Sequence, residues 1–163
     1  MQQVGTMQDV QRICDTSKIG EIFISYGYLI PREDLTTIRH SEDIINYLRE
    51  KCFNPLSINY REESYAIFLN RANLVIGWHQ LSVGGITGTV VDPRVLLTLA
   101  LGCGATSIVL AHNHPSGSLK PSRADEAMTE KIRHCCAMLD IALLDHLILS
   151  DTSFFSFADN GLI

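Results

Sequence analysis

The chain has 163 residues, of which 46% are hydrophobic, and its formal net charge is −5 at pH 7. This length and apolar content predict one globular domain whose core closes without disulfides. Nucleic-acid affinity rests mainly on Lys and Arg that neutralise phosphates, so the excess of acidic residues argues against direct DNA binding. No apolar run approaches the roughly 20 residues of a membrane span, and we expect no membrane association.

The cysteines and the N-terminal residues bear on compartment and domain organisation. The five cysteines are scattered, odd in number and contain no Cys-x-x-Cys pair. This pattern indicates neither a disulfide framework nor a cysteine zinc site, and it favours a reducing, cytoplasmic location. Residues 1–19 show little pattern and no apolar signal core, so we interpret them as a lead-in segment to a single domain of residues 20–163.

The first half of the domain predicts a strand, a helix and a hairpin. Residues 21–26 form a compact β-rich run. Ser41, followed by two acidic residues, begins an amphipathic helix that closes at Asn54-Pro55. Residues 62–70 and 74–78 then predict two strands joined by a short turn.

The second half leads to a buried strand. Asp92-Pro93 is a good helix entry, with Asp as the N-cap and Pro at the first helical position, and Gly102 or Gly104 should end this helix. Residues 107–111 are an apolar strand of the kind that is buried on both faces. Its carboxyl end delivers two histidines, at the edge where open α/β sheets place ligands.

A last helix and strand complete the pattern. Ser122-x-x-Asp125 has the form of a capping box. A strand over residues 141–149 is expected to be interrupted by Asp145-His146, and residues 154–157 are expected to add a last short strand. Helices and strands alternate without repeats or linkers, which predicts a three-layer α/β/α sandwich on a mixed sheet. After the capping box, apolar residues recur at helical spacing and predict a helix. They are Ala124, Met128, Ile132, Cys135 and Leu139.

The segment after the buried strand carries the chemistry. His112 and His114 are separated by one residue, so in an extended segment their side chains point the same way. Pro115 and Gly117 turn the chain immediately afterwards, and Asp125 follows one turn into the next helix. Two neutral imidazoles, one carboxylate and an open fourth position are what a catalytic zinc site needs.

Each of these residues also has a simpler interpretation. The two histidines could be a hydrogen-bonded pair in a turn. Asp125 could serve only as the acidic member of the capping box, and we expect that it cannot fully cap the helix and bind metal at once. His146 is interpreted as a core histidine whose hydrogen bonds are satisfied, and His79 and His134 are given no role.

The motif resembles that of a known family. His112-x-His114-Pro115 with Ser122-x-x-Asp125 is similar to the zinc motif of JAMM metalloproteases of the JAB/MPN type, and residues 111–117 look like the bacterial RadC branch. Further RadC-like landmarks cover roughly residues 20–163: Phe68-Leu69-Asn70-Arg71, Gly85-Ile86-Thr87-Gly88-Thr89, Asp92-Pro93-Arg94 and Leu144-Asp145-His146.

This resemblance implies a cytidine-deaminase-like fold and a zinc ion held by His112, His114 and Asp125, with water as the fourth ligand. It also implies an upstream glutamate as general base. Because no Glu occurs between residues 64 and 125, we assign Glu62 to this role, with Glu63 as the alternate. By the same analogy Ser122 would donate a hydrogen bond to the oxyanion. The implied activity is zinc-dependent hydrolysis of a peptide or isopeptide bond in an unidentified peptide or protein substrate.

Three other functions compete with zinc-dependent hydrolysis. A zinc deaminase would need His-x-Glu followed by Pro-Cys-x-x-Cys, and neither is present. A DNA-repair-associated accessory protein without significant hydrolase activity is the main alternative. The family often carries an N-terminal helix-hairpin-helix region, which we do not expect in so short a chain. An inactive metal-binding scaffold would result if neither glutamate reached the site. An exposed sheet edge makes a homodimer possible.

Overall fold

The computed structural model describes residues 26–27, 31–84 and 91–163. A short 3-10 helix, η1 (Arg32–Asp34), precedes the first long helix, α2 (Ser41–Lys51). The interpretations of residues 1–19 as a lead-in segment and of residues 21–26 as a strand lie outside the described residues, apart from Tyr26. The remaining elements are β1 (Glu63–Leu69), β2 (Val75–Val83), α3 (Pro93–Cys103), β3 (Ser107–Asn113), α4 (Arg123–Ala137), β4 (Ala142–Leu149) and β5 (Phe154–Ser156).

The strands form one mixed sheet in the order β2-β1-β3-β4-β5. β3 and β4 are parallel, and the other neighbouring pairs are antiparallel. The antiparallel register of β1 and β3 sets Ser64 directly opposite His112. This pairing brings the start of β1 beside the end of β3, where the candidate site lies.

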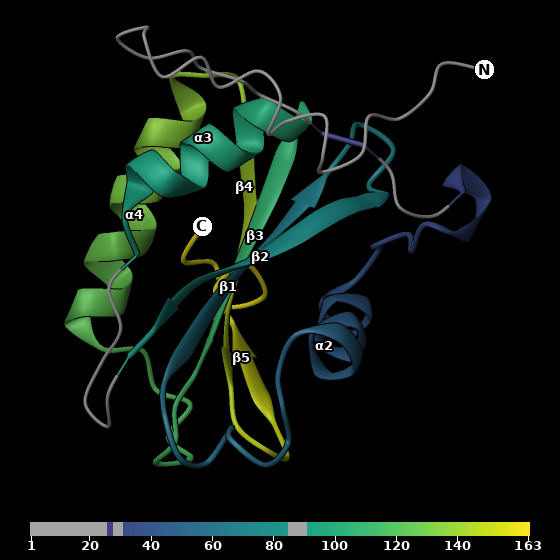
Figure 1. Cartoon of the computed structure of the whole chain (residues 1–163). Coiled ribbons are helices and arrows are strands. Elements are labelled where there is room, and N and C mark those ends of the chain that lie inside the picture. The colour runs from purple at the N-terminus through teal and green to yellow at the C-terminus, as the bar shows by residue number, and fades with distance from the viewer. Residues whose placement is uncertain (1–25, 28–30, 85–90) are drawn as a thin grey trace, which may run out of the picture.

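Apolar side chains on the two faces of the sheet form two separate cores. Tyr65, Ile67 and Leu69 alternate along β1 and pack on the face covered by α2. On the other face, Ile108 and Leu110 pack with residues of α3 and α4, including Leu96 and Ile132. Figure 1 shows the result, with α2 on one side of the sheet and α3 and α4 on the other. The predicted three-layer α/β/α sandwich on a mixed sheet is confirmed.

The helix ends follow the local chemistry expected of them. The Asp92 side chain accepts a hydrogen bond from the backbone N–H of Arg94, and Pro93 is the first residue of α3. Gly104 rather than Gly102 ends this helix, with a positive φ of 65° that glycine adopts without steric cost. At α2 the N-cap is His40, one residue before the predicted start.

Two details of the predicted elements are wrong. β4 runs through Asp145 and His146 without interruption, and the irregularity comes one residue earlier, where Leu144 is skipped in the pairing with β3. The buried face of α4 also differs from the predicted apolar stripe. Three of its four buried positions lie one residue after a predicted one, because the polar side chains of Asp125 and Thr129 face the end of β3. Its buried members are Asp125, Thr129, Ile132 and Cys136.

Candidate metal centre

His112 and His114 meet at the carboxyl end of β3. His112 is the penultimate residue of the strand and is buried, whereas His114 follows the strand and is partly exposed. Their Nε2 atoms lie 3.0 Å apart. The prediction that the two imidazoles point toward one position is therefore confirmed.

Asp125 joins them from the first turn of α4. One carboxylate oxygen, Oδ1, lies 3.4 Å from Nε2 of His112, and the other, Oδ2, lies 3.7 Å from Nε2 of His114. The three side chains offer ligand atoms that all lie within 4.8 Å of one another. Within the described part of the chain, no fourth His, Cys, Asp or Glu belongs to this group.

The capping box that positions Asp125 is complete. Its Oδ2 accepts a hydrogen bond from the backbone N–H of Ser122 at 2.7 Å, and its own N–H donates to Ser122 Oγ at 3.1 Å. Asp125 makes the full cap while belonging to the metal group, and the expectation that metal binding and capping compete stays a prediction. Its two oxygens divide the work, since Oδ1 faces His112 while Oδ2 makes the cap, and the positive end of the helix stabilises the carboxylate in both roles.

Hydrogen bonding and burial leave the histidine nitrogens ready to act as ligands. His114 Nδ1 lies 2.7 Å from the carbonyl oxygen of Ser118. A carbonyl only accepts, so Nδ1 carries the hydrogen and Nε2 of the neutral ring keeps its lone pair. Burial lowers the pKa of His112 to about 4, with the Asp125 carboxylate opposing this shift and His114 adding to it. The His112 ring is therefore neutral at pH 7.

This donor set fits a zinc ion. Zinc bonds of about 2.0–2.2 Å in a tetrahedron separate neighbouring ligand atoms by roughly 3.3–3.6 Å. The separation of 3.0 Å between the two Nε2 atoms and that of 3.4 Å between His112 Nε2 and Asp125 Oδ1 lie close to that range, and one ligand atom from each of the three residues lies within 4.8 Å of the others. Two imidazoles and one carboxylate are the ligand types of catalytic zinc sites, which keep one position open, whereas structural sites are usually closed by four protein ligands.

Glu62 and Glu63, the two candidates for the general base, are neighbours at the start of β1, and Glu63 is the first residue of the strand. Glu62 precedes β1, and its carbonyl still accepts a hydrogen bond from Gly84 as the hairpin begins. Side chains alternate along a strand, so we expect a continuation of β1 by one residue to direct Glu62 to the face of Ser64 and His112. Continuing the register of β1 and β3 brings Glu62 level with His114.

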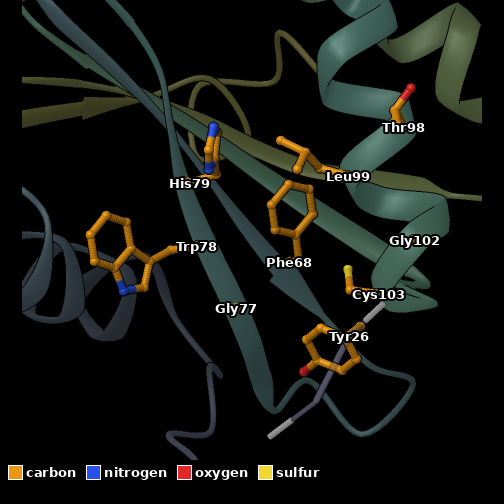
Figure 2. A pocket seen from close by; sticks show the side chains of 9 residues that line it. All are labelled: Tyr26, Phe68, Gly77, Trp78, His79, Thr98, Leu99, Gly102 and Cys103. Carbon is orange, nitrogen blue, oxygen red and sulfur yellow. The ribbon is translucent and has the colours of Figure 1, made fainter. Parts of the chain in front are cut away.

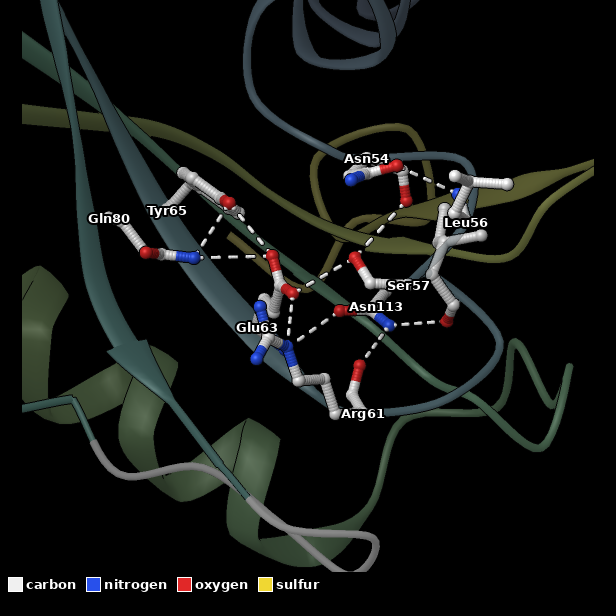
Figure 3. A network of polar contacts seen from close by, with 9 residues as sticks. Asn54, Leu56, Ser57, Arg61, Glu63, Tyr65, Gln80 and Asn113 are labelled. Carbon is white, nitrogen blue, oxygen red and sulfur yellow. Dashed lines mark hydrogen bonds and ion pairs between the residues drawn. The ribbon is translucent and has the colours of Figure 1, made fainter.

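Glu63 faces the α2 side, where its carboxylate is held by a network of polar side chains (Figure 3). One oxygen accepts from Arg61 Nε at 2.7 Å and Ser57 Oγ at 3.1 Å. The other accepts from the hydroxyl of Tyr65 at 2.8 Å and from Gln80 Nε2 at 3.2 Å. Four donors occupy this carboxylate, so Glu63 does not reach the metal group.

Sequence reasoning missed part of the site. His146 is buried, with its hydrogen bonds satisfied as predicted, but its Nε2 is 2.9 Å from Nδ1 of the ligand His112. Its Nδ1 is 2.6 Å from the hydroxyl oxygen of Thr129, a residue that the sequence pattern does not single out. The sequence spacing could have indicated Thr129, because it lies four residues after Asp125 and therefore on the same face of the predicted helix.

A separate, mostly apolar hollow lies between β2 and α3 (Figure 2). Its volume is about 200 Å³, and none of the three metal-group residues lines it. Phe68, Leu99 and Cys103 contribute much of its wall. The Trp78 side chain points away from these residues and lies 6.0 Å, ring to ring, from Tyr65.

Comparison with known proteins identifies the family. The sequence model of one protein family, described as the RadC-like JAB domain, matches residues 38–162 of this chain. The chain belongs to this family. The resemblance to the RadC branch inferred from the motif is thus confirmed, and so is the JAB/MPN form of the α/β sandwich.

Several curated relatives of this RadC-like JAB domain bear the name UPF0758 protein. One from Flavobacterium johnsoniae is 50% identical over 101 residues, covering 62% of this chain and 44% of the relative. Another from Streptococcus gordonii is 40% identical over 112 residues, covering 69% and 50%. A third from Chlorobaculum parvum is 33% identical over 126 residues, covering 77% and 55%. The chain spans about half the length of these relatives.

One further observation concerns membranes. Among the helices of the described residues, none combines the length and the apolar character that crossing a bilayer requires.

Proposed function

We propose that this RadC-like JAB domain is a zinc-dependent hydrolase of the JAMM type that cleaves a peptide or isopeptide bond. The observation that carries the proposal is the convergence of His112, His114 and Asp125 on one point with no fourth ligand among the described residues. Family membership adds support, because the JAB superfamily includes hydrolases.

The three ligands define what the site can do. His112, His114 and Asp125 would hold the ion through two nitrogens and one oxygen, leaving one position for water or substrate. A zinc ion bound there supplies Lewis acidity, which lowers the pKa of a water molecule toward about 7 and polarises a carbonyl oxygen. The buried, neutral imidazole of His112 suits this purpose, since no proton has to be displaced from it at pH 7.

Glu62 is proposed as the general base. The alternation of side chains along β1 supports this assignment, because it would direct Glu62 to the His112 face, from which its carboxylate would approach a water molecule above the metal group. It would accept a proton from that water during attack on the carbonyl and then deliver the proton to the leaving amine. Glu63 is unsuited to the role, because four hydrogen-bond donors surround its carboxylate on the opposite face.

Ser122 is proposed to stabilise the oxyanion. Its Oγ accepts a hydrogen bond from the Asp125 N–H, and this contact uses only a lone pair. The hydroxyl hydrogen therefore remains available for donation toward the substrate. The residue is exposed at the helix N-terminus, where positive partial charge adds to its effect on developing negative charge.

Metal content tests the first part of the proposal. The purified protein should hold about one zinc per chain, and His114→Ala should lose it. His134→Ala is the matched control, because His134 is exposed on α4 and pairs with Glu130 rather than with the metal group. Elemental analysis after dialysis distinguishes these outcomes, and equal zinc content in His114→Ala and the wild type would refute the site.

Hydrolysis tests the second part. Quenched fluorogenic peptides containing either a main-chain peptide bond or a lysine-linked isopeptide bond can be screened with the zinc-loaded protein. Cleavage that is lost on chelation and restored by zinc supports the proposal. A protein that binds one zinc yet cleaves neither class would favour a metal-binding scaffold instead.

A further inference from the structure

A line of buried polar groups runs from the metal group into the protein. His112 Nδ1 contacts His146 Nε2 at 2.9 Å, and His146 Nδ1 contacts Thr129 Oγ1 at 2.6 Å. Thr129 Oγ1 in turn lies 2.6 Å from the backbone carbonyl oxygen of Asp125. The line thus leads from one ligand residue to another through side chains of β4 and α4, and His146 and Thr129 are only 1% and 2% exposed.

The direction of every hydrogen in this line follows from its last member. The Asp125 carbonyl can only accept, so at 2.6 Å the Thr129 hydroxyl must donate to it. That hydroxyl has a single hydrogen and must therefore accept from His146 Nδ1–H. The reverse orientation would leave two acceptor oxygens facing each other at 2.6 Å inside the core, which is costly.

The same logic extends to the metal ligand. The His146 ring is 1% exposed, and the groups at its two ring nitrogens, the His112 ring and the Thr129 hydroxyl, carry no negative charge that would hold a second proton on it. With its hydrogen on Nδ1, its Nε2 must accept, and the only donor that can supply this contact is Nδ1–H of His112. A neutral His112 with hydrogen on Nδ1 carries its lone pair on Nε2, the atom that faces His114 and Asp125.

We propose that His146 and Thr129 are positioning residues that hold His112 in the tautomer whose Nε2 can bind the metal. This inference rests on the metal site of the proposed function. His114, at the surface, is set by the Ser118 carbonyl in a single step, whereas His112 is buried and needs a relay of two side chains. Stacking on Phe157, with ring centroids 4.8 Å apart and planes 20° from parallel, keeps the His146 ring in place.

Zinc affinity of paired variants tests the relay. Thr129→Val removes the hydroxyl while keeping the side-chain shape, and Thr129→Ser is the matched control that retains it. In competition with a chromogenic chelator, Thr129→Val and His146→Phe should bind zinc about 10–100-fold more weakly, as is typical when a partner of a ligand is lost. Thr129→Ser should stay within a few-fold of the wild type. Equal affinity in Thr129→Val and Thr129→Ser would overturn the proposal.

A second measurement keeps the test independent of folding defects. Long-range ¹H–¹⁵N correlation spectra of the wild-type protein report which ring nitrogen carries hydrogen. We expect Nδ1–H for both His112 and His146, and a hydrogen on Nε2 of His146 would refute the relay even if His146→Phe does not fold. If zinc binding is unaffected by His114→Ala, the metal site itself fails; if His114→Ala loses zinc while Thr129→Val keeps it, only the relay fails.

Discussion

Neighbouring residues at one end of the sheet serve opposite purposes on its two faces. On the α3 and α4 side, His112 joins His114 and Asp125 in the candidate metal centre. On the α2 side, Glu63 and Asn113 belong to a closed polar network (Figure 3). In the metal group the ligand atoms of the three side chains converge on one point. In the polar network, by contrast, the Glu63 carboxylate and the Asn113 amide are hydrogen-bonded to several partners.

The two faces are also mechanically connected. Asn113, between the two histidine ligands, accepts the Glu63 backbone N–H at 2.7 Å and donates to the carbonyls of Ile58 and Arg61 at 2.6 and 2.8 Å. These contacts fasten the turn that leads into β1 against the strand that carries His112. The difference shows that a saturated polar network can hold the backbone while the opposite face keeps reactive groups available.

The largest expected effect separates the two adjacent glutamates. Glu62→Gln should retain zinc but lower kcat about 10²–10⁴-fold, the usual contribution of a general base. Glu63→Gln should leave kcat within a few-fold, because its carboxylate lies on the other face. Steady-state kinetics on the peptide that the protein cleaves, with zinc content measured in parallel, gives the comparison. Equal losses in both variants would break the assignment of separate roles to the two faces.

A smaller kinetic effect is expected at Ser122. Ser122→Ala removes the proposed oxyanion donor and should lower kcat about 10²–10³-fold. It also removes the helix cap, at a cost of about 0.5–2 kcal/mol in the free energy of unfolding. Ser122→Asp separates the two roles, since a carboxylate caps the helix but has no hydrogen to donate. Full activity in Ser122→Asp would limit Ser122 to a structural role.

For the polar network the expected effect is on stability. Glu63→Gln removes the charge that accepts from Arg61, Ser57 and Tyr65 and should lower the free energy of unfolding by about 1–3 kcal/mol. Glu62→Gln should change it by only about 0.5 kcal/mol. Urea denaturation of both variants measures the contrast, and a larger loss for Glu62→Gln would reverse our view of which face stabilises the fold.

The smallest effect is a pH dependence. Burial raises the pKa of Glu63, but the hydrogen bonds from Arg61, Tyr65 and Ser57 outweigh it, so the pKa lies below its ordinary value. Such a group stabilises the fold above its unfolded pKa of about 4.3 and loses that contribution as the pH falls through the folded pKa. The stability difference between the wild type and Glu63→Gln should therefore shrink below about pH 4.3. A difference that grows on acidification would contradict this.

Much of the fold and the ligand set could be predicted because their signals are local. The cap at Asp92-Pro93 and the capping box of Ser122 and Asp125 depend on contacts within a few residues, and the structure contains both. The same is true of His112 and His114, whose alternation in an extended segment follows from backbone geometry alone. Asp125 was identified by its place one turn into a helix.

What the sequence by itself determined, then, is the order of the elements, the helix caps and the three candidate metal ligands. Tertiary structure alone decided that Glu63 joins the polar network on the α2 side, because its partners Ser57, Tyr65 and Gln80 come together only through the pairing of β1 with β2 and the packing of the preceding turn. It also decided that His146 and Thr129 meet His112, since parallel pairing of β4 and packing of α4 bring them together. Side-chain chemistry is local, but the partners of a buried polar group are chosen by long-range packing, which no short segment encodes.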